Sequence, residues 1–255
     1  MQRRRADIVF AVTLLAAAVA LFSLPRIPQD LSYHAMADTR TMFGVPNALN
    51  VLSNVPFAFT GGLGLIALAR ARRSSAAGFA DGWYWAAYLA LFGGVALTCV
   101  GSSYYHLAPD NARLVWDRLP MTVGFMGFVA AMLEERVRPG LARQLLLPLL
   151  LLGAFSVAWW TWSESRGAGD LRLYGLVQFG SLASVVLMIA LYRSGPSGAR
   201  YVVAALGLYG LAKVFEALDR PIFAIGQVVS GHTLKHLAAA AAIVPLAVMI
   251  RRRTM

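Results

Sequence analysis

Histidine is the residue type whose placement in this 255-residue chain most directly suggests chemistry. The chain has four histidines, and three of them (His106, His232 and His236) lie in apolar stretches. Imidazole is costly to place in hydrocarbon unless it is paired, binds a metal or lines a wet cavity. His232 and His236 are four residues apart, so on a helix they lie on one face and can hold one ion. Three neutral imidazoles with a fourth position open are the pattern of a catalytic zinc, and we predict that these histidines bind Zn²⁺.

Two oxygen-bearing residues accompany His106. Ser102 precedes it by four residues and so lies on the same helical face, from which its hydroxyl can donate a hydrogen bond to a developing oxyanion. Asp117 follows His106 by eleven residues, across a turn, and can orient a water molecule or accept its proton. A zinc ion polarises a carbonyl and lowers the pKa of a bound water to about 7. We therefore predict catalytic roles for Ser102 and Asp117.

Each of these residues also has an ordinary structural interpretation. A single histidine at a membrane boundary can be an interfacial anchor, which is our interpretation of His34. Asp117 can pair with Arg113 or with Arg118, and Ser102 can donate to the backbone of its own helix. Their predicted position at one depth, argued below from the charges, favours the metal site.

The elements that carry these residues are expected to be membrane-spanning helices. The chain is 58% hydrophobic with a mean hydropathy of +0.62, too apolar for an ordinary soluble domain. Runs of about 20 apolar residues, enough to cross about 30 Å of hydrocarbon, recur along it. We predict an all-α polytopic bundle forming one integral membrane domain, with eight spans at residues 7–24, 46–69, 83–107, 113–134, 142–162, 173–192, 200–218 and 229–250.

The basic residues are distributed unevenly over the loops between these spans. The net charge is +11, and 14 of the 23 basic residues fall on one side, with five on the other and four within spans. This asymmetry is the positive-inside pattern and places both termini in the cytoplasm. It explains the basicity without a nucleic-acid partner, so the expected partner is the lipid bilayer. The same topology puts His106, Asp117, His232 and His236 at the outer ends of their spans.

Several features leave alternatives open or exclude a class of site. The first apolar stretch resembles a signal peptide, but Leu21–Pro25 lacks a small-x-small cleavage site, so we expect a retained helix. Cleavage would leave seven spans in the same orientation. Cys99 is the only cysteine, which excludes an intramolecular disulfide and a cysteine-based metal site.

Polar residues gather in the second span and in the seventh. Four of them follow one side of the second span, as interhelical hydrogen-bonding groups or as the lining of a cavity: Asn47, Asn50, Ser53 and Asn54. Lys213 and Glu216, three residues apart, are expected to neutralise each other, and Asp219 to cap a helix or pair with Arg220. The long connection Pro25–Val45 is expected to fold over the outer face.

The order and spacing of these residues resemble a known family. Gly101-Ser102, His106, Asp117-Arg118-Leu119-Pro120-Met121 and the terminal His232-x-x-x-His236 are similar to the alkaline ceramidase family, which belongs to a wider group of seven-span membrane hydrolases and adiponectin-receptor-like proteins. The resemblance covers Asn47 to the C-terminus. It implies a seven-helix hydrolase core at residues 46–255 and an additional N-terminal helix and outer loop at residues 1–45. It also implies zinc at the three histidines, with Ser102 as oxyanion helper and Asp117 as water activator.

The implied reaction is hydrolysis of the amide bond of a ceramide-like lipid to a fatty acid and a long-chain base. Asn50 and Asn54 resemble asparagines on the first helix of the family. Family members also hold Ca²⁺ through several acidic residues before that helix, whereas the corresponding segment here offers only Asp30 and Asp38, so the sequence does not support a calcium site.

Other functions follow from the same residues. One is a receptor or sensor in which zinc is structural, and another is a hydrolase of a different lipid amide or an ester. A transporter is less favoured because no span is broken by paired Gly and Pro. The chain uses 21 arginines and two lysines, a bias typical of GC-rich bacteria, so we expect a bacterial inner-membrane protein. The sequence does not indicate an oligomeric state.

Overall fold

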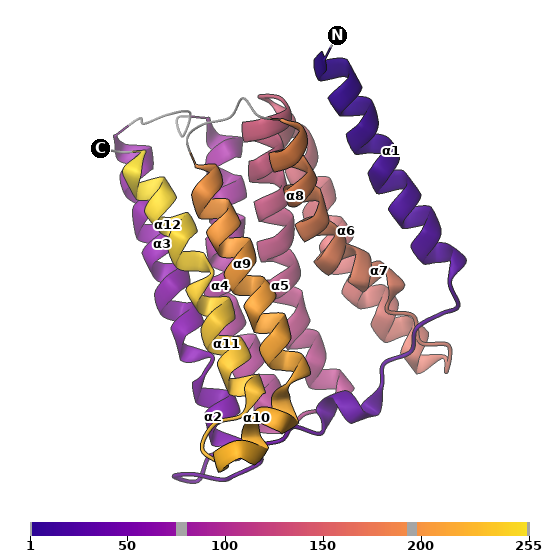
Figure 1. The fold of residues 1–255 in the computed structure, drawn as a ribbon, viewed down its shortest axis with the longest axis vertical. Coiled ribbons are helices and arrows are strands. Elements are labelled where there is room, and N and C mark those ends of the chain that lie inside the picture. The colour runs from indigo at the N-terminus through magenta and orange to yellow at the C-terminus, as the bar shows by residue number, and fades with distance from the viewer. Residues whose placement is uncertain (1, 75–80, 193–197, 254–255) are drawn as a thin grey trace. The chain divides into compact units, whose positions relative to one another are not determined.

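The computed structural model describes residues 2–74, 81–192 and 198–253. These residues are mostly helical, and the only β-type pairing among them is an isolated bridge between Met42 and Val45. The helices, with short 3₁₀- and π-helices marked η, are α1 (Gln2–Ser23), η1 (Leu31–His34), α2 (Ala48–Leu52), α3 (Val55–Arg73), α4 (Gly82–Leu107), α5 (Asn111–Met132), η2 (Leu133–Val137), α6 (Leu141–Ser165), α7 (Arg172–Gly175), η3 (Leu176–Gly180), α8 (Ser181–Leu191), α9 (Ala199–Ala217), α10 (Asp219–Gly226), α11 (Gly231–Ala241) and α12 (Ile243–Arg252) (Figure 1).

Several of these helices are suited to a membrane. Six helical stretches of the described residues are long and apolar enough to cross one, and α9 with α10, bent by 70°, adds a seventh if the pair counts as one span. The chain is therefore an all-α polytopic membrane protein, as predicted. The six stretches are Arg3–Ser23, Ala48–Arg73, Gly82–Leu107, Leu141–Ser165, Arg172–Leu191 and Gly231–Arg252.

The number of spans differs from the eight that the sequence predicts. Each predicted span contains a helix, but α5 is not among the apolar stretches, and α9 qualifies only together with α10. α5 is 22 residues long and carries Arg113, Asp117 and Arg118, while α9 carries Lys213 and Glu216. Ionisable residues are the costliest groups to place in hydrocarbon, and they lower the apolarity of both helices.

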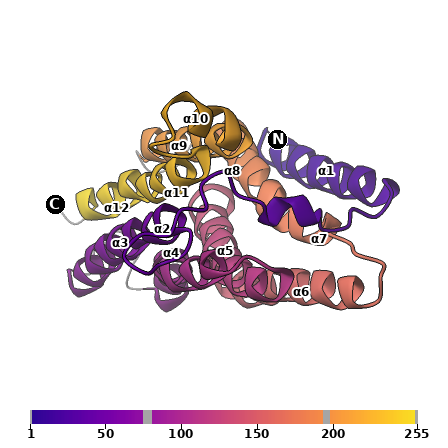
Figure 2. The ribbon, with the colours of Figure 1, turned by 90° about the horizontal axis from the view of Figure 1, so that it is seen from below.

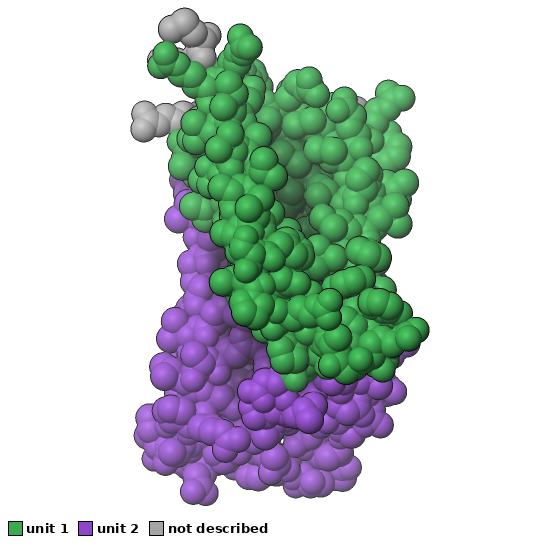
Figure 3. Space-filling view, turned by 90° about the vertical axis from the view of Figure 1, so that its right-hand side faces the viewer, with its two compact units in different colours: residues 1–29, 81–91, 122–199 green, residues 30–80, 92–121, 200–255 purple. Residues whose placement is uncertain are grey.

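The chain divides into two compact units (Figure 3). Unit 1 comprises residues 1–29, 81–91 and 122–199. Unit 2 comprises residues 30–80, 92–121 and 200–255. All five residues predicted for the active site belong to unit 2.

In unit 2 the helix made of α11 and α12 packs along the one made of α2 and α3. The pairs α12–α3 and α11–α2 are in contact, and both views show these helices side by side (Figures 1 and 2). This pairing brings the first turns of α11, which carry His232 and His236, next to the polar residues of α2.

Two glycines allow the close approaches that position the predicted site. A Cβ on Gly101 would lie 2.0 Å from the carbonyl oxygen of Trp116, so this glycine lets α4 contact α5 one residue before Ser102 and Asp117. A Cβ on Gly231 would lie 2.2 Å from the carbonyl oxygen of Phe215, so this glycine lets the start of α11 contact α9. Larger residues at either position require the helices to separate.

In unit 1, α1 is tied to the rest of the unit by polar contacts near both of its ends. The Tyr192 hydroxyl after α8 donates to the Asp7 carboxylate at 2.7 Å. The Arg172 guanidinium donates to the carbonyl oxygens of Phe22 and Leu24 at 3.0 and 2.7 Å. These contacts satisfy backbone groups at the end of the helix.

Candidate metal centre

The three histidines come from two helices of unit 2. His106 lies in the last turn of α4, and His232 and His236 lie on successive turns of α11. All three are buried, with 1%, 5% and 3% of their surface exposed. The only group of three or more histidine, cysteine or acidic residues that can hold a metal ion among the described residues consists of these three.

The imidazole rings face one another across a small space. Each pair of ring centroids is 4.8 Å apart, and one nitrogen from each ring lies within 4.8 Å of the others. His106 Nε2 and His232 Nε2 are 3.3 Å apart. Two nitrogen ligands of a tetrahedral zinc, each about 2.0–2.1 Å from the ion, lie about 3.3–3.4 Å apart. The cluster therefore has the size that a metal ion of this kind requires.

The Nδ1 atoms of two of the rings contact neighbouring side chains. His236 Nδ1 lies 2.8 Å from the Ser53 hydroxyl. His106 Nδ1 lies 3.2 Å from the sulfur of Met36. With Nδ1 occupied, Nε2 of each ring is the nitrogen left for a metal. Contacts of this kind fix the ring orientation and the tautomer of metal ligands.

Asp117 lies near Ser102, which precedes His106 by one helical turn. Asp117 lies in the second turn of α5 and Ser102 one turn before His106 on α4, and both are buried. The Ser102 hydroxyl lies near the Asp117 carboxylate. Arg113, one alternative partner of Asp117, instead contacts Asp110 and the carbonyl oxygen of Ala108.

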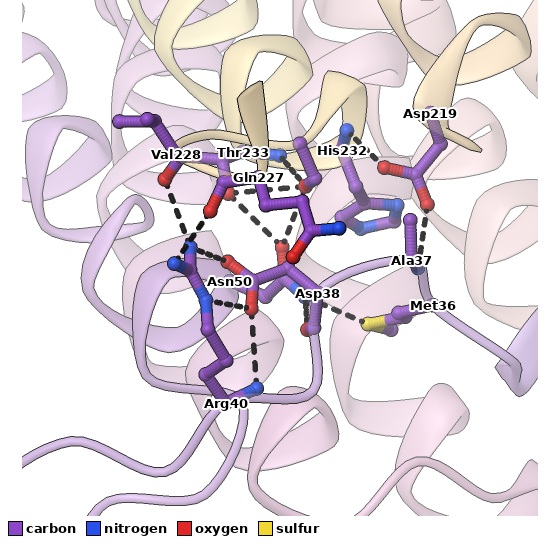
Figure 4. Close-up of polar contacts among 11 residues, drawn as sticks. Met36, Ala37, Asp38, Arg40, Asn50, Asp219, Gln227, Val228, His232 and Thr233 are labelled. Carbon is purple, nitrogen blue, oxygen red and sulfur yellow. Dashed lines mark hydrogen bonds and ion pairs between the residues drawn. The ribbon is translucent and has the colours of Figure 1, made fainter. Parts of the chain in front are cut away.

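The start of α11 is fixed by two caps, from Asp219 and Ser230. Asp219 accepts hydrogen bonds from the backbone N–H of His232 at 2.8 Å and of Ala37 at 3.0 Å (Figure 4). The Ser230 hydroxyl accepts from the N–H of Thr233 at 3.1 Å. Asp219 was expected to cap a helix or to pair with Arg220, and the structure shows the cap. These acceptors satisfy free N–H groups at the start of α11. They thereby fix the position of His232 along the helix axis.

Asn50 joins α2, α11 and the long connection before α2. Its amide nitrogen donates to the carbonyl oxygen of Asp38 at 2.9 Å, and its amide oxygen accepts from the Thr233 hydroxyl at 3.1 Å (Figure 4). The same side chain lies near Met36, at 3.4 Å from the sulfur. The polar residues of this span were interpreted either as hydrogen-bonding groups between helices or as the lining of a cavity. Asn50 hydrogen bonds between segments, and the Ser53 hydroxyl contacts the His236 ring.

Within the connection that was expected to fold over the outer face, residues 30–45 fold across the end of unit 2 that carries the histidines. The Arg40 guanidinium forms a two-point contact with the Asp38 carboxylate and donates to the carbonyl oxygens of Gln227 and Val228 at 2.6 and 2.8 Å (Figure 4). The hydrogen bonds from Arg40 lower the pKa of Asp38 below its usual value. His34, expected at an interface, contacts the Tyr105 hydroxyl and the Asn111 side chain, each at 2.9 Å.

A cluster of opposite charges lies on another side of α11. Lys235 contacts Glu216 of α9 at 2.7 Å, and Lys213 contacts the other oxygen of the same carboxylate. The predicted pairing of Lys213 with Glu216 is confirmed. Lys235 is a partner that the sequence argument missed, because the spacing within α9 does not reveal what α11 presents to it.

Met36 is the other neighbour of the site that sequence reasoning missed. It lies in an irregular segment 70 residues before His106, and no periodic pattern relates the two residues. Comparison of the chain with protein-family models finds no match, and a search of curated proteins finds no relative. The arrangement of the residues is therefore the basis of the functional argument.

Proposed function

We propose that this chain is a zinc-dependent intramembrane hydrolase that cleaves the amide bond of a ceramide-like lipid to a fatty acid and a long-chain base. The observation that carries the proposal is the cluster of three buried imidazoles, with Ser102 one helical turn before His106 and Asp117 near Ser102. The identity of the metal and the chemistry of the substrate are part of the proposal, and the sequence resemblance supports them.

The residues present fit a zinc ion. Three nitrogen donors at the spacing described leave one tetrahedral position open, which is the pattern of catalytic rather than closed structural sites. When bound, the ion would act as a Lewis acid on the amide carbonyl and make a water molecule more acidic. His106, His232 and His236 would hold it.

Asp117 would move the proton. Its carboxylate accepts a proton from the attacking water, whose oxygen forms a bond to the amide carbon. The C–N bond then breaks, and Asp117 delivers the same proton to the departing amine nitrogen. The products are a carboxylic acid and an amine, with no oxidant or reductant needed. General acid–base catalysis of this type contributes about 10²–10⁴-fold to a rate.

Ser102 would change partners during this cycle. While Asp117 is ionised, the Ser102 hydroxyl would donate to it and hold the carboxylate in position. Once Asp117 has taken a proton, it no longer needs that donor, and the hydroxyl is free to donate to the carbonyl oxygen as negative charge develops there. The two residues thus support successive stages of one reaction.

A panel of lipid substrates tests the proposal. Purified protein is incubated with ceramides, with other long-chain amides and with matched esters, with and without a chelator. Release of fatty acid that a chelator abolishes and added zinc restores supports the hydrolase. One bound zinc without turnover of any of these lipids would contradict it and favour a receptor or sensor with structural zinc.

A further inference from the structure

A cavity in unit 1 is lined by residues that take no part in the metal centre. It has a volume of about 320 Å³ and opens where the start of α1 meets η2, the start of α6 and the residue that follows α8. Arg3, Arg138, Asp7 and Tyr192 supply its polar atoms, and apolar side chains such as Phe10 complete the wall. None of these residues has a role in the proposed hydrolysis.

The cavity carries an excess of positive charge. Arg3 and Arg138 contribute two guanidinium groups and Asp7 one carboxylate. Burial, followed by the contact with Asp7, raises the pKa of Tyr192 to about 12, so the phenol stays neutral and donates to Asp7. Arg3 donates to the carbonyl oxygen of Val137. Within the described part of the chain, the Arg138 guanidinium has no hydrogen-bond or ion-pair partner.

The surroundings of the cavity are those of a membrane interface. Arg3, Arg4 and Arg5 precede the apolar part of α1, whose side chains Ile8 and Val9 are 54% and 46% exposed. Basic groups next to exposed apolar helix surface attract anionic lipid headgroups, and basic pockets between membrane helices bind them. A phosphate can reach the two arginines while the adjoining chain lies against Phe10.

We propose that this cavity binds the phosphodiester headgroup of an anionic membrane phospholipid, with Arg3 and Arg138 contacting the phosphate. Inorganic phosphate carries the same anionic group as the lipid headgroup and is therefore the competing ligand. The apolar wall favours the lipid, because it gives free phosphate no additional contact.

The test compares lipids retained by the purified full-length protein. The protein is equilibrated with equal amounts of phosphatidylglycerol and phosphatidylcholine, and native mass spectrometry counts the lipids bound. One arginine near an anionic lipid contributes about fivefold to binding. We expect phosphatidylglycerol to be preferred at least about fivefold, and Asp7→Asn to increase the preference by a similar factor.

Arginine variants of equal charge locate the site. The double variant Arg3→Gln with Arg138→Gln should abolish the preference, whereas Arg4→Gln with Arg5→Gln, outside the cavity wall, should keep it. Loss of the contact between Arg3 and the carbonyl oxygen of Val137 can loosen α1, so Arg138→Gln is also measured alone. The proposal is overturned if both double variants weaken binding equally, if neither lipid is preferred, or if inorganic phosphate displaces the lipid at equal concentration. Metal content should not change in any of these variants.

Discussion

One short helix, α11, takes part in two polar clusters, one buried and one partly exposed, that are satisfied in different ways. Towards α9, Lys235 and Lys213 share the carboxylate of Glu216, so each charge has a partner of opposite sign within the chain. Towards α4, His232 and His236 meet His106, and three rings of one chemical type face each other. Like groups cannot satisfy one another fully, because each Nε2 left as an acceptor needs a donor or a cation.

The difference separates a structural cluster from a site that needs a ligand. The charge cluster pairs two ammonium groups with one carboxylate and has Asp117 as a further acidic neighbour of Lys235, and its expected contribution is to stability. The histidine cluster has the arrangement of donors that can hold a metal ion, and its expected contribution is to binding and chemistry. Variants in the charge cluster should therefore lose stability and keep the metal, whereas variants in the histidine cluster should lose metal binding.

The largest effect is expected for His232→Ala. Loss of one of three ligands should weaken metal binding at least about a thousandfold, since each ligand carries several kcal/mol of the binding free energy. Titration of the metal-free protein with zinc measures this. His34→Gln is the matched control, because His34 contacts Tyr105 and Asn111 and lies outside the cluster. Equal weakening in both variants would argue against the assigned ligands.

Asp117→Asn should separate metal binding from turnover. The amide keeps the shape of the carboxylate but cannot take up the proton, so we expect a loss of about 10²–10⁴-fold in kcat with unchanged metal content. Asp110→Asn removes a partly exposed carboxylate that contacts Arg113 and serves as the control. Retention of activity in Asp117→Asn would remove Asp117 from the mechanism.

Glu216→Gln should give the opposite profile, a loss of stability with metal retained. It leaves Lys213 and Lys235 without their shared carboxylate. Breaking a fully buried pair costs about 3–5 kcal/mol, and because these side chains are 16–32% exposed we expect about 2–3 kcal/mol. Denaturant unfolding in detergent measures the cost. Lys213→Met, which leaves one lysine on the carboxylate, should cost less, and the reverse order would contradict this description of the cluster.

The smallest effect is expected for Ser53→Ala. Removal of the hydroxyl that contacts His236 Nδ1 should weaken zinc binding about tenfold, the lower end for groups that orient metal ligands. Ser103→Ala removes a neighbouring hydroxyl that contacts the carbonyl oxygen of Val51 and should leave zinc binding unchanged. The same titration measures both variants.

Much of the site could be predicted from the sequence because its residues lie at regular spacings on helices. The four-residue step from His232 to His236 fixes a common face, and the charge asymmetry of the loops places His106 and Asp117 at the same end of their helices. These arguments need only helix geometry and topology.

The remaining contacts depend on tertiary packing and could not be predicted in this way. Met36 reaches His106 through an irregular segment whose path no periodicity describes. Lys235 meets Glu216 across a close approach of α11 to α9 that Gly231 allows. Charged residues that interrupt an apolar helix, as in α5, also make the number of spans harder to predict from the sequence.

The most direct test of the central claim is the zinc content of the pure wild-type protein, measured by elemental analysis beside the variant that replaces all three histidines by alanine. We expect about one zinc per chain in the wild type and none in the variant. Zinc below about half an equivalent in active wild-type protein, or equal zinc in both proteins, would contradict this claim.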